Sequence, residues 1–236
     1  MTLRGPRFLP LAAALLLVAL PTSAQDLTVV SKVTFGDRED TQTQYMTSER
    51  SRSSDERSDV IIHFPTGALT FIDHEKKEYF ETTIEEMASF MDRMVRDMKG
   101  TPAEAMFGVS GEAEVEKLPG KQKIAGYDCG RYSISIGDAL ELDLWAAPGL
   151  KPPPRYFDGR KLAYAAMGPL GKLYERMFDE MKNIGGYPLS TAVILRTPVS
   201  RTQTLTEAVE VKKGPIPASA FDLPSGYRKK KSPYAR

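Results

Sequence analysis

Polar and apolar residues alternate along much of this chain, and this period of two constrains the fold more than any other feature. In residues 27–35 the odd positions are mostly apolar and the even positions mostly polar, and the alternation recurs through 131–136 and 139–144. Such strands have one buried face and one solvated face, which is typical of an antiparallel sheet. Further strands are expected at 41–50, 59–64, 67–73, 78–82, 113–118, 189–197 and 202–212.

A first segment with the helical period follows Thr83. The apolar residues of 84–98 share one face of a helix, so this segment is predicted to be amphipathic. Thr83 and Glu86 have the spacing of a capping box, which satisfies backbone amides at the start of a helix. Gly100 supplies the signal that ends it.

A second amphipathic helix is predicted to begin at 168–169. Its proline suits the first helical position, where the missing backbone amide is not needed. The helix is expected to end at the glycine pair 185–186. Three prolines at 152–154 form a stiff connector before it, and residues 155–167 are expected to hold a further helical turn.

The order of these elements indicates the fold class. Short turns such as 73–77 and 137–138 link neighbouring strands, and helices are too few for a repeating βαβ pattern. The sequence therefore predicts an α+β protein with an antiparallel sheet. Because a sheet of about ten strands is expected to curl, we predict a strongly curved half-barrel with the two amphipathic helices covering its concave face.

The first 24 residues read as a segment for export. Arg4 and Arg7 precede the apolar run 8–20, and small residues precede a cleavage site. The run is shorter than the roughly 20 residues that a bilayer span needs, and no later stretch is apolar enough to span a membrane. We expect a periplasmic or secreted protein with a signal peptide at 1–24, a single domain at 25–227 and a basic disordered tail at 228–236.

Residues that carry catalysis or bind metals are few. Cys129 is the single cysteine, and His63 and His74 are the only histidines, which removes most zinc sites and most histidine-dependent enzymes. No nucleophile elbow or phosphate-binding glycine motif is present. The chain between the export segment and the basic tail is acidic, which argues against nucleic-acid binding. We expect no enzyme activity, no catalytic residue, no metal site and no cofactor.

Short segments spread over the chain together resemble a known family. They are residues 67–73, 76–79, 123–129 with Tyr132, and 221–227. In this order and spacing they are similar to the DUF4412 family of secreted proteins, within the LolA/LolB-like superfamily of periplasmic lipoprotein carriers. The resemblance implies a curved antiparallel sheet with helices filling its concave side. From the carrier relatives it also implies lipid or lipoprotein acyl chains bound in that concavity.

Methionines are concentrated in the two helices. Because thioether side chains are flexible and polarizable, a methionine-rich face can repack around apolar ligands of varied shape; alternatively, both faces pack on the sheet as core. We predict a hydrophobic ligand, such as a lipid acyl chain, in a cavity between sheet and helices. The expected lining residues are Met87, Phe90, Met91 and Met94 from the first helix, and Ile134 and Leu142 from the strands.

Two other interpretations stay open. One is a non-enzymatic envelope interaction or scaffold protein, with a filled core and a surface that binds a protein partner. The other is a hydrolase that uses Glu141 and Asp143, which share one strand face. The hydrolase requires both carboxylates in a concave cleft with one pKa raised, whereas their alternation with leucines is typical of a solvated strand face.

Overall fold

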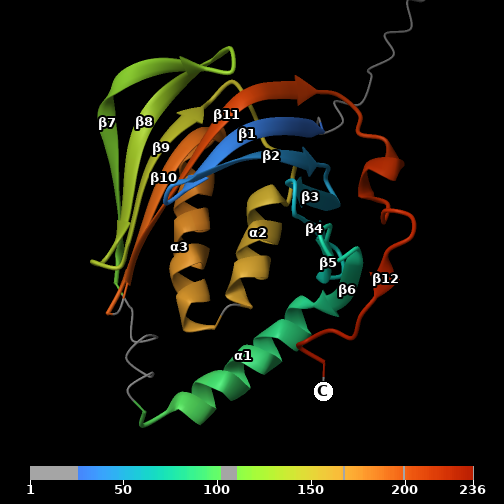
Figure 1. The fold of residues 1–236 in the computed structure, drawn as a ribbon. Helices are drawn as coiled ribbons and strands as arrows, with labels where there is room; N and C mark the ends of the chain where they lie inside the picture. Colours follow the sequence, from blue (N-terminus) through green and yellow to red (C-terminus); the bar gives the residue numbers. More distant parts are fainter. Residues whose placement is uncertain (1–25, 102–110, 167, 199, 236) are drawn as a thin grey trace, which may run out of the picture.

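One open sheet of twelve strands dominates the computed structural model, which describes residues 26–101, 111–166, 168–198 and 200–235. The strand order is β12-β6-β5-β4-β3-β2-β1-β11-β10-β9-β8-β7. Neighbouring strands pair antiparallel, except that β12 lies parallel to β6. The predicted α+β class with a strongly curved antiparallel sheet is confirmed (Figure 1).

The elements have the following bounds. The first six strands are β1 (Leu27–Phe35), β2 (Arg38–Met46), β3 (Arg50–Ser54), β4 (Ser58–His63), β5 (Ala68–Asp73) and β6 (Glu78–Thr83). The later strands are β7 (Ala113–Ile124), β8 (Tyr127–Ile136), β9 (Leu140–Ala147), β10 (Tyr187–Thr197), β11 (Ser200–Lys213) and β12 (Arg228–Lys229). The helices are α1 (Ile84–Met98), α2 (Tyr156–Ala165), α3 (Pro169–Ile184) and the short 3-10 helix η2 (Ala218–Phe221).

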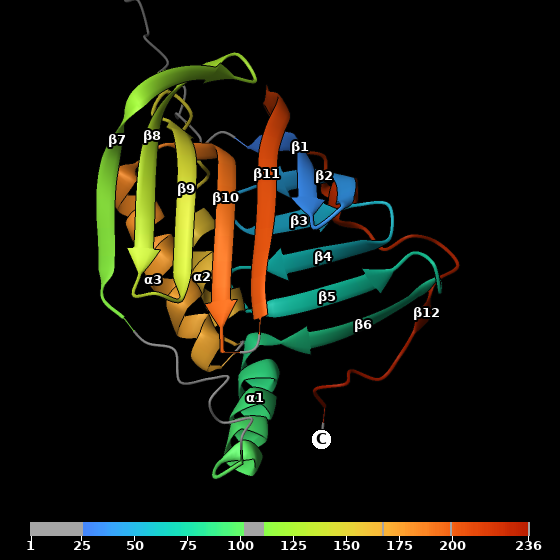
Figure 2. The same cartoon turned by 60° about the vertical axis from the view of Figure 1, so that its left-hand side comes forward.

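The sheet curls around two helices. α2 and α3 pack together inside its concave face, and α1 lies across the lower opening next to β6 (Figures 1 and 2). In β9 the leucines at 140, 142 and 144 are buried toward the helices, so Glu141 and Asp143 point to the convex face. A large core joins these leucines to Leu173 and Phe178 of α3.

The strand at the start of the described chain joins the two halves of the sheet. β1 pairs with β2 on one side and with β11 on the other. Figure 2 shows β3–β6 running crosswise to β7–β10, as expected for a strongly twisted sheet. Under β4 and β5 lies a second, smaller core of Ile62, Phe64 and Leu69, which packs against Ile84, Met87 and Ala163. The space under the sheet is therefore divided between a large core at α3 and a small one at α1.

Local signals in the sequence predicted several features correctly. The Glu86 amide donates to Thr83 Oγ1 at 3.1 Å and the Thr83 amide donates to Glu86 Oε2 at 3.3 Å, so the capping box of α1 is confirmed. Pro169 opens α3 as predicted. The tight turn between β8 and β9 contains Gly137 with a φ of 49°, a left-handed conformation that glycine adopts without strain.

Two stretches differ from their predictions. The expected strand 41–50 breaks into β2 and β3, because Thr47 Oγ1 accepts the amides of Glu49 and Arg50 in a tight turn. The expected helical turn within 155–167 is a complete third helix, α2. Gly159 weakens the intrinsic helix propensity there, yet packing requires it, because a Cβ at this position would lie 2.1 Å from the ring of Phe64.

The C-terminal residues also differ from the expectation of a disordered tail at 228–236. Arg228 and Lys229 form β12 along the edge of β6, and Lys230 extends this pairing by donating its amide to Tyr79 O at 2.7 Å. The Arg228 guanidinium binds Glu78 at 2.7 Å. The acidic side chains of the edge strand attract the basic segment, and backbone hydrogen bonds fix its register.

The predicted signal peptide at 1–24 lies outside the described residues. The domain boundaries expected at 25 and 227 stay a prediction. Among the helices formed by the described residues, none has both the length and the apolar character needed to cross a bilayer.

Candidate ligand-binding site

A cavity lies inside the curve of the sheet, between the strands and the pair α2 and α3. Its volume is about 220 Å³. Strands β1, β2, β9, β10 and β11 form one wall, and side chains of α2 and α3 form the other. Much of this wall is polar, with Gln42 and Gln44 from β2 facing Tyr156 and Tyr164 from α2. We call this space the polar cavity.

Arg160 of α2 is the only charged side chain among the described residues that line the polar cavity. Its guanidinium carbon lies 5.6 Å from the ring centroid of Tyr164 and 5.8 Å from that of Phe178, within the range of cation–π attraction. Its Nε is buried and has no hydrogen-bond partner. Within the described part of the chain, no carboxylate forms an ion pair with it. Among the described residues, this positive charge therefore has aromatic neighbours but no counter-ion.

Neutral hydroxyl groups surround this charge. Tyr187 Oη donates a hydrogen bond to Gln44 Oε1 at 2.7 Å, and Tyr156 Oη approaches the same oxygen at 3.5 Å. Burial raises the pKa of Tyr187 well above its ordinary value. Burial also raises the pKa of Tyr174, another residue of the lining. These phenols stay protonated at neutral pH and do not neutralise the arginine.

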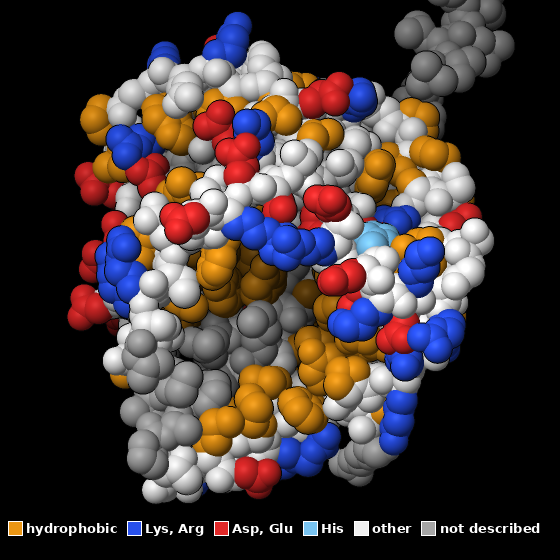
Figure 3. All heavy atoms as spheres, in the orientation of Figure 1, with side chains coloured by type: hydrophobic (Ala, Val, Ile, Leu, Met, Phe, Trp, Pro, Cys, Tyr) orange, Lys and Arg blue, Asp and Glu red, His pale blue; other side chains and the backbone are white. Residues whose placement is uncertain are grey.

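A second space, which we call the apolar groove, lies next to α1. Its volume is about 570 Å³, and α1, α2 and strands β3, β4 and β5 provide most of its walls. Hydrophobic side chains gather around a hollow on this face of the molecule (Figure 3). The apolar groove and the polar cavity share Gln42, Arg160 and Tyr164 as lining residues. These three side chains therefore lie at the boundary between the two spaces.

The six residues predicted to line a ligand site fall in different places. Met87 and Met91 line the apolar groove, and Leu142 lines the polar cavity. Phe90 instead packs edge-to-face on Tyr234, with ring centroids 5.4 Å apart. The remaining two residues are absent from the described lining of both spaces: Met94 is half-buried and Ile134 is fully buried in the large core. A role in ligand binding stays a prediction for all six.

Arg160 and its aromatic neighbours were missed from the sequence. Tyr156, Arg160 and Tyr164 are spaced four residues apart, so on a helix they share one face. This spacing was the available signal, and the expectation of a single turn at 155–167 hid it. The polar side of the site therefore became visible only when α2 was seen as a complete helix.

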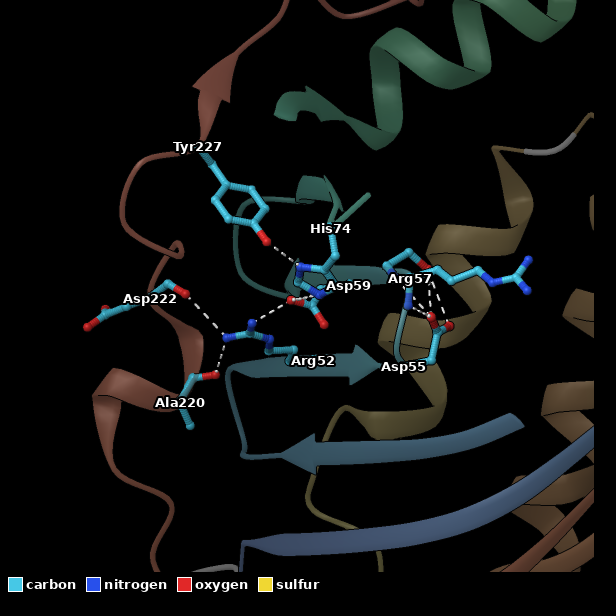
Figure 4. Close-up of polar contacts among 9 residues, drawn as sticks. Arg52, Asp55, Arg57, Asp59, His74, Ala220, Asp222 and Tyr227 are labelled. Carbon is cyan, nitrogen blue, oxygen red and sulfur yellow. Dashed lines mark hydrogen bonds and ion pairs between the residues drawn. The ribbon is translucent and has the colours of Figure 1, made fainter. Parts of the chain in front are cut away.

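A separate polar cluster fastens the C-terminal segment to strands β3, β4 and β5 (Figure 4). Asp59 is almost fully buried, and its Oδ2 lies 2.5 Å from Arg52 Nη2 and 3.1 Å from His74 Nε2. Arg52 Nη1 also donates to the carbonyl oxygens of Ala220 at 2.8 Å and Asp222 at 3.2 Å. We call this cluster the C-terminal clamp.

A hydrogen bond of 2.9 Å between Tyr227 Oη and His74 Nδ1 completes the C-terminal clamp. His74 lies in the turn after β5, and Tyr227 lies just before β12. The clamp thus joins β3, β4 and the turn after β5 to 221–227, one of the segments that carry the family resemblance.

The carboxylates of the hydrolase interpretation do not share a concave cleft. Asp143 is bound by Arg131, and Glu141 Oε2 lies 2.7 Å from Arg196 Nη2, both on the convex face. Hydrogen bonding to Asp143 raises the pKa of Arg131. Each carboxylate is tied to its own arginine, so the geometry expected of a glycosidase pair is absent at these two residues.

Comparison with known proteins supports the predicted resemblance. A family model described as "Domain of unknown function (DUF4412)" matches residues 17–227. A search of curated proteins finds no match.

Several solved structures are similar to this chain at low sequence identity. A structure of PNGF-II matches with 12% identity and a TM-score of 0.41, over 89% of this chain and 31% of that chain. MucB from Pseudomonas aeruginosa, in its complex with MucA, matches with 10% identity and a TM-score of 0.41, over 86% and 56%. A putative outer membrane lipoprotein-sorting protein domain from Vibrio parahaemolyticus matches with 9% identity and a TM-score of 0.32, over 85% and 91%. The chain thus spans less than a third of PNGF-II and just over half of MucB.

Proposed function

The chain belongs to the DUF4412 family, and from that premise we propose that it is an exported, periplasmic or secreted protein of the cell envelope that binds a hydrophobic ligand. The ligand, such as a lipid acyl chain, would occupy the apolar groove between α1, α2 and strands β3–β5. The role proposed is binding rather than catalysis.

The observation that carries this proposal is the incomplete burial of α1. The helix is strongly amphipathic, yet none of its fifteen residues, all described, is buried. Met87 and Met91 instead face the apolar groove. An amphipathic helix of a globular protein normally buries its apolar face against a core, so a ligand in the groove would supply the contacts that the described residues do not.

The size and the walls of the groove suit an acyl chain. Its volume of about 570 Å³ lies within the range of about 300–1,000 Å³ that is usual for small-molecule sites. Each CH₂ group removed from water contributes about 0.8 kcal/mol. Thioether side chains adapt to chains of different length and saturation. The groove therefore favours a flexible apolar ligand over a rigid polar one.

Native mass spectrometry of protein purified without detergent tests the proposal. We expect an added mass that corresponds to a bound lipid, or a 1:1 complex with added palmitate. A clean mass of the ligand-free chain that stays unchanged in lipid titrations would contradict the proposal. It would favour the alternative of an envelope protein that binds a protein partner through its surface.

A pair of variants locates the site. Met91→Trp places a large ring in the apolar groove and should weaken binding of a fluorescent fatty-acid analogue by about tenfold or more. Met98→Trp is the matched control, because Met98 is on the same helix but outside the described lining of the groove. Equal binding by both variants would move the site away from the groove.

A further inference from the structure

We propose that the ligand of this site is an anionic amphiphile, whose negatively charged head group binds Arg160 while its tail lies in the apolar groove. This inference rests on the proposed function and adds the chemical class of the ligand. A carboxylate and a phosphate head group share the required chemistry, namely oxygen acceptors and negative charge.

The first reason is the state of Arg160 itself. A guanidinium carries five N–H donors and matches the geometry of carboxylate or phosphate oxygens. Here its Nε is buried without a partner, and it forms no ion pair within the described chain. The aromatic rings of Tyr164 and Phe178 compensate the charge only in part. Arg160 is half-buried, and a charge partly removed from water without an anion is costly, so an anionic ligand would lower that cost.

The second reason is the location of the guanidinium. Arg160 and Tyr164 line both the polar cavity and the apolar groove, so a head group bound at Arg160 would lie next to the groove. The polar cavity, at about 220 Å³, is smaller than usual ligand sites but large enough for a head group. Its described lining contains no aspartate or glutamate that would repel an anion.

The third reason is the supply of neutral donors around the guanidinium. Gln42 lines both spaces and offers a side-chain amide, which can donate hydrogen bonds. Tyr164 and Tyr174 line the same cavity and their hydroxyl groups can also donate, whereas the Tyr187 hydroxyl already donates to Gln44 Oε1. Hydroxyl and amide donors stabilise an anion without adding charge. The polar cavity thus has the chemistry of a head-group pocket, and the groove has that of a tail pocket.

Competition experiments with three probes of equal chain length test the inference. The probes are palmitate, hexadecyl phosphate and the neutral alcohol hexadecanol, each displacing the fluorescent analogue. We expect the wild-type protein to bind at least one anionic probe about tenfold or more tightly than hexadecanol. The relative affinities of palmitate and hexadecyl phosphate then distinguish a fatty acid from a phospholipid source.

Two variants separate the head-group claim from simple tail binding. Arg160→Met should remove the preference for the anionic probes over hexadecanol. Lys172→Met is the matched control, since this exposed residue of α3 loses the same charge outside both described linings. Circular dichroism and thermal unfolding show whether each variant is folded.

The outcomes are distinguishable. Equal affinity of the wild-type protein for hexadecanol and both anions would overturn the inference while supporting the proposed function. An anion preference that persists in Arg160→Met, or that is lost equally in Lys172→Met, would also overturn it. If none of the three probes binds, the proposed function fails together with the inference.

Discussion

Two arginines lie inside this fold, and their surroundings are opposite. Arg52 on β3 binds the buried Asp59 and donates to two backbone carbonyls of the C-terminal segment. Arg160 on α2 faces two aromatic rings and has no anion among the described residues. Burying a charge is costly unless it is paired. Arg52 therefore has an anionic partner within the chain, although its Nε and Asp59 Oδ1 are buried without a hydrogen-bond partner, whereas the described residues supply no anion for Arg160.

The same substitution in the two regions should have opposite effects on stability, and the larger effect is expected at the clamp. Among the described residues, Arg52→Met leaves the buried carboxylate of Asp59 with His74 as its remaining side-chain contact. We expect the free energy of unfolding to fall by about 3–5 kcal/mol. Urea unfolding followed by circular dichroism measures it. A loss below about 1 kcal/mol would show that Asp59 does not depend on Arg52.

Arg160→Met is the counterpart in the polar cavity. Methionine keeps an unbranched apolar side chain and removes an unpaired charge, so the ligand-free protein should gain about 1–2 kcal/mol of stability. The same urea experiment, on protein stripped of lipid, provides the measurement. A loss of stability comparable to that of Arg52→Met would mean that the cation–π contacts or an unrecognised partner already satisfy Arg160, and the contrast between the two arginines would disappear.

The sequence predicted the secondary structure and the curved sheet much better than it predicted the different surroundings of Arg52 and Arg160. Alternation in residues such as 140–144 predicts which side chains face inward, and Thr83 with Glu86 predicts where α1 begins. Neither signal reports how much space remains beneath the sheet. The methionines of both helices have the same periodicity, yet Met177 is 5% exposed and lies in the large core, whereas α1 buries no residue. How much of the space beneath the sheet is filled by side chains depends on the curvature of the whole sheet. The local alternation of residues does not encode that curvature.

The partners of the clamp could not be predicted for a related reason. Asp59 and His74 lie in separate elements, and Ala220 is far from both in the sequence. Their contacts depend on where the C-terminal segment crosses β3 to β6, which is a long-range property of the topology. The acidic residues of β6 and the basic residues after Gly226 carried an available signal, because opposite charges on neighbouring segments attract.

A smaller effect is expected from the outer end of the clamp. Tyr227→Phe removes the hydroxyl that lies 2.9 Å from His74 Nδ1 and keeps the ring. We expect a loss of about 1 kcal/mol, together with faster amide hydrogen exchange at Lys230, whose amide bonds to Tyr79. Hydrogen exchange at the amides of β9 is the internal control, because β9 lies far from β12 in the strand order. Uniformly faster exchange in both regions would contradict a local role for Tyr227.

The smallest effect concerns pH. Burial raises the pKa of Tyr187 in the folded state, while the unfolded chain has a tyrosine pKa of about 10. Above that pH the unfolded chain releases a proton that the folded protein keeps, so the stability from this residue is present below about pH 10 and lost as pH rises. Tyr187→Phe should therefore lose less stability than the wild type between about pH 9 and pH 11. Parallel pH profiles would show that Tyr187 has no raised pKa.

The most direct test of a ligand in the apolar groove is NMR of protein with ¹³C-labelled methionine methyl groups, titrated with palmitate. The account predicts that the resonances of Met87 and Met91, which line the groove, shift on binding. The resonance of Met46, fully buried in the large core, should stay in place. Unchanged Met87 and Met91 resonances at saturating palmitate would contradict the account, as would equal shifts at all three methionines.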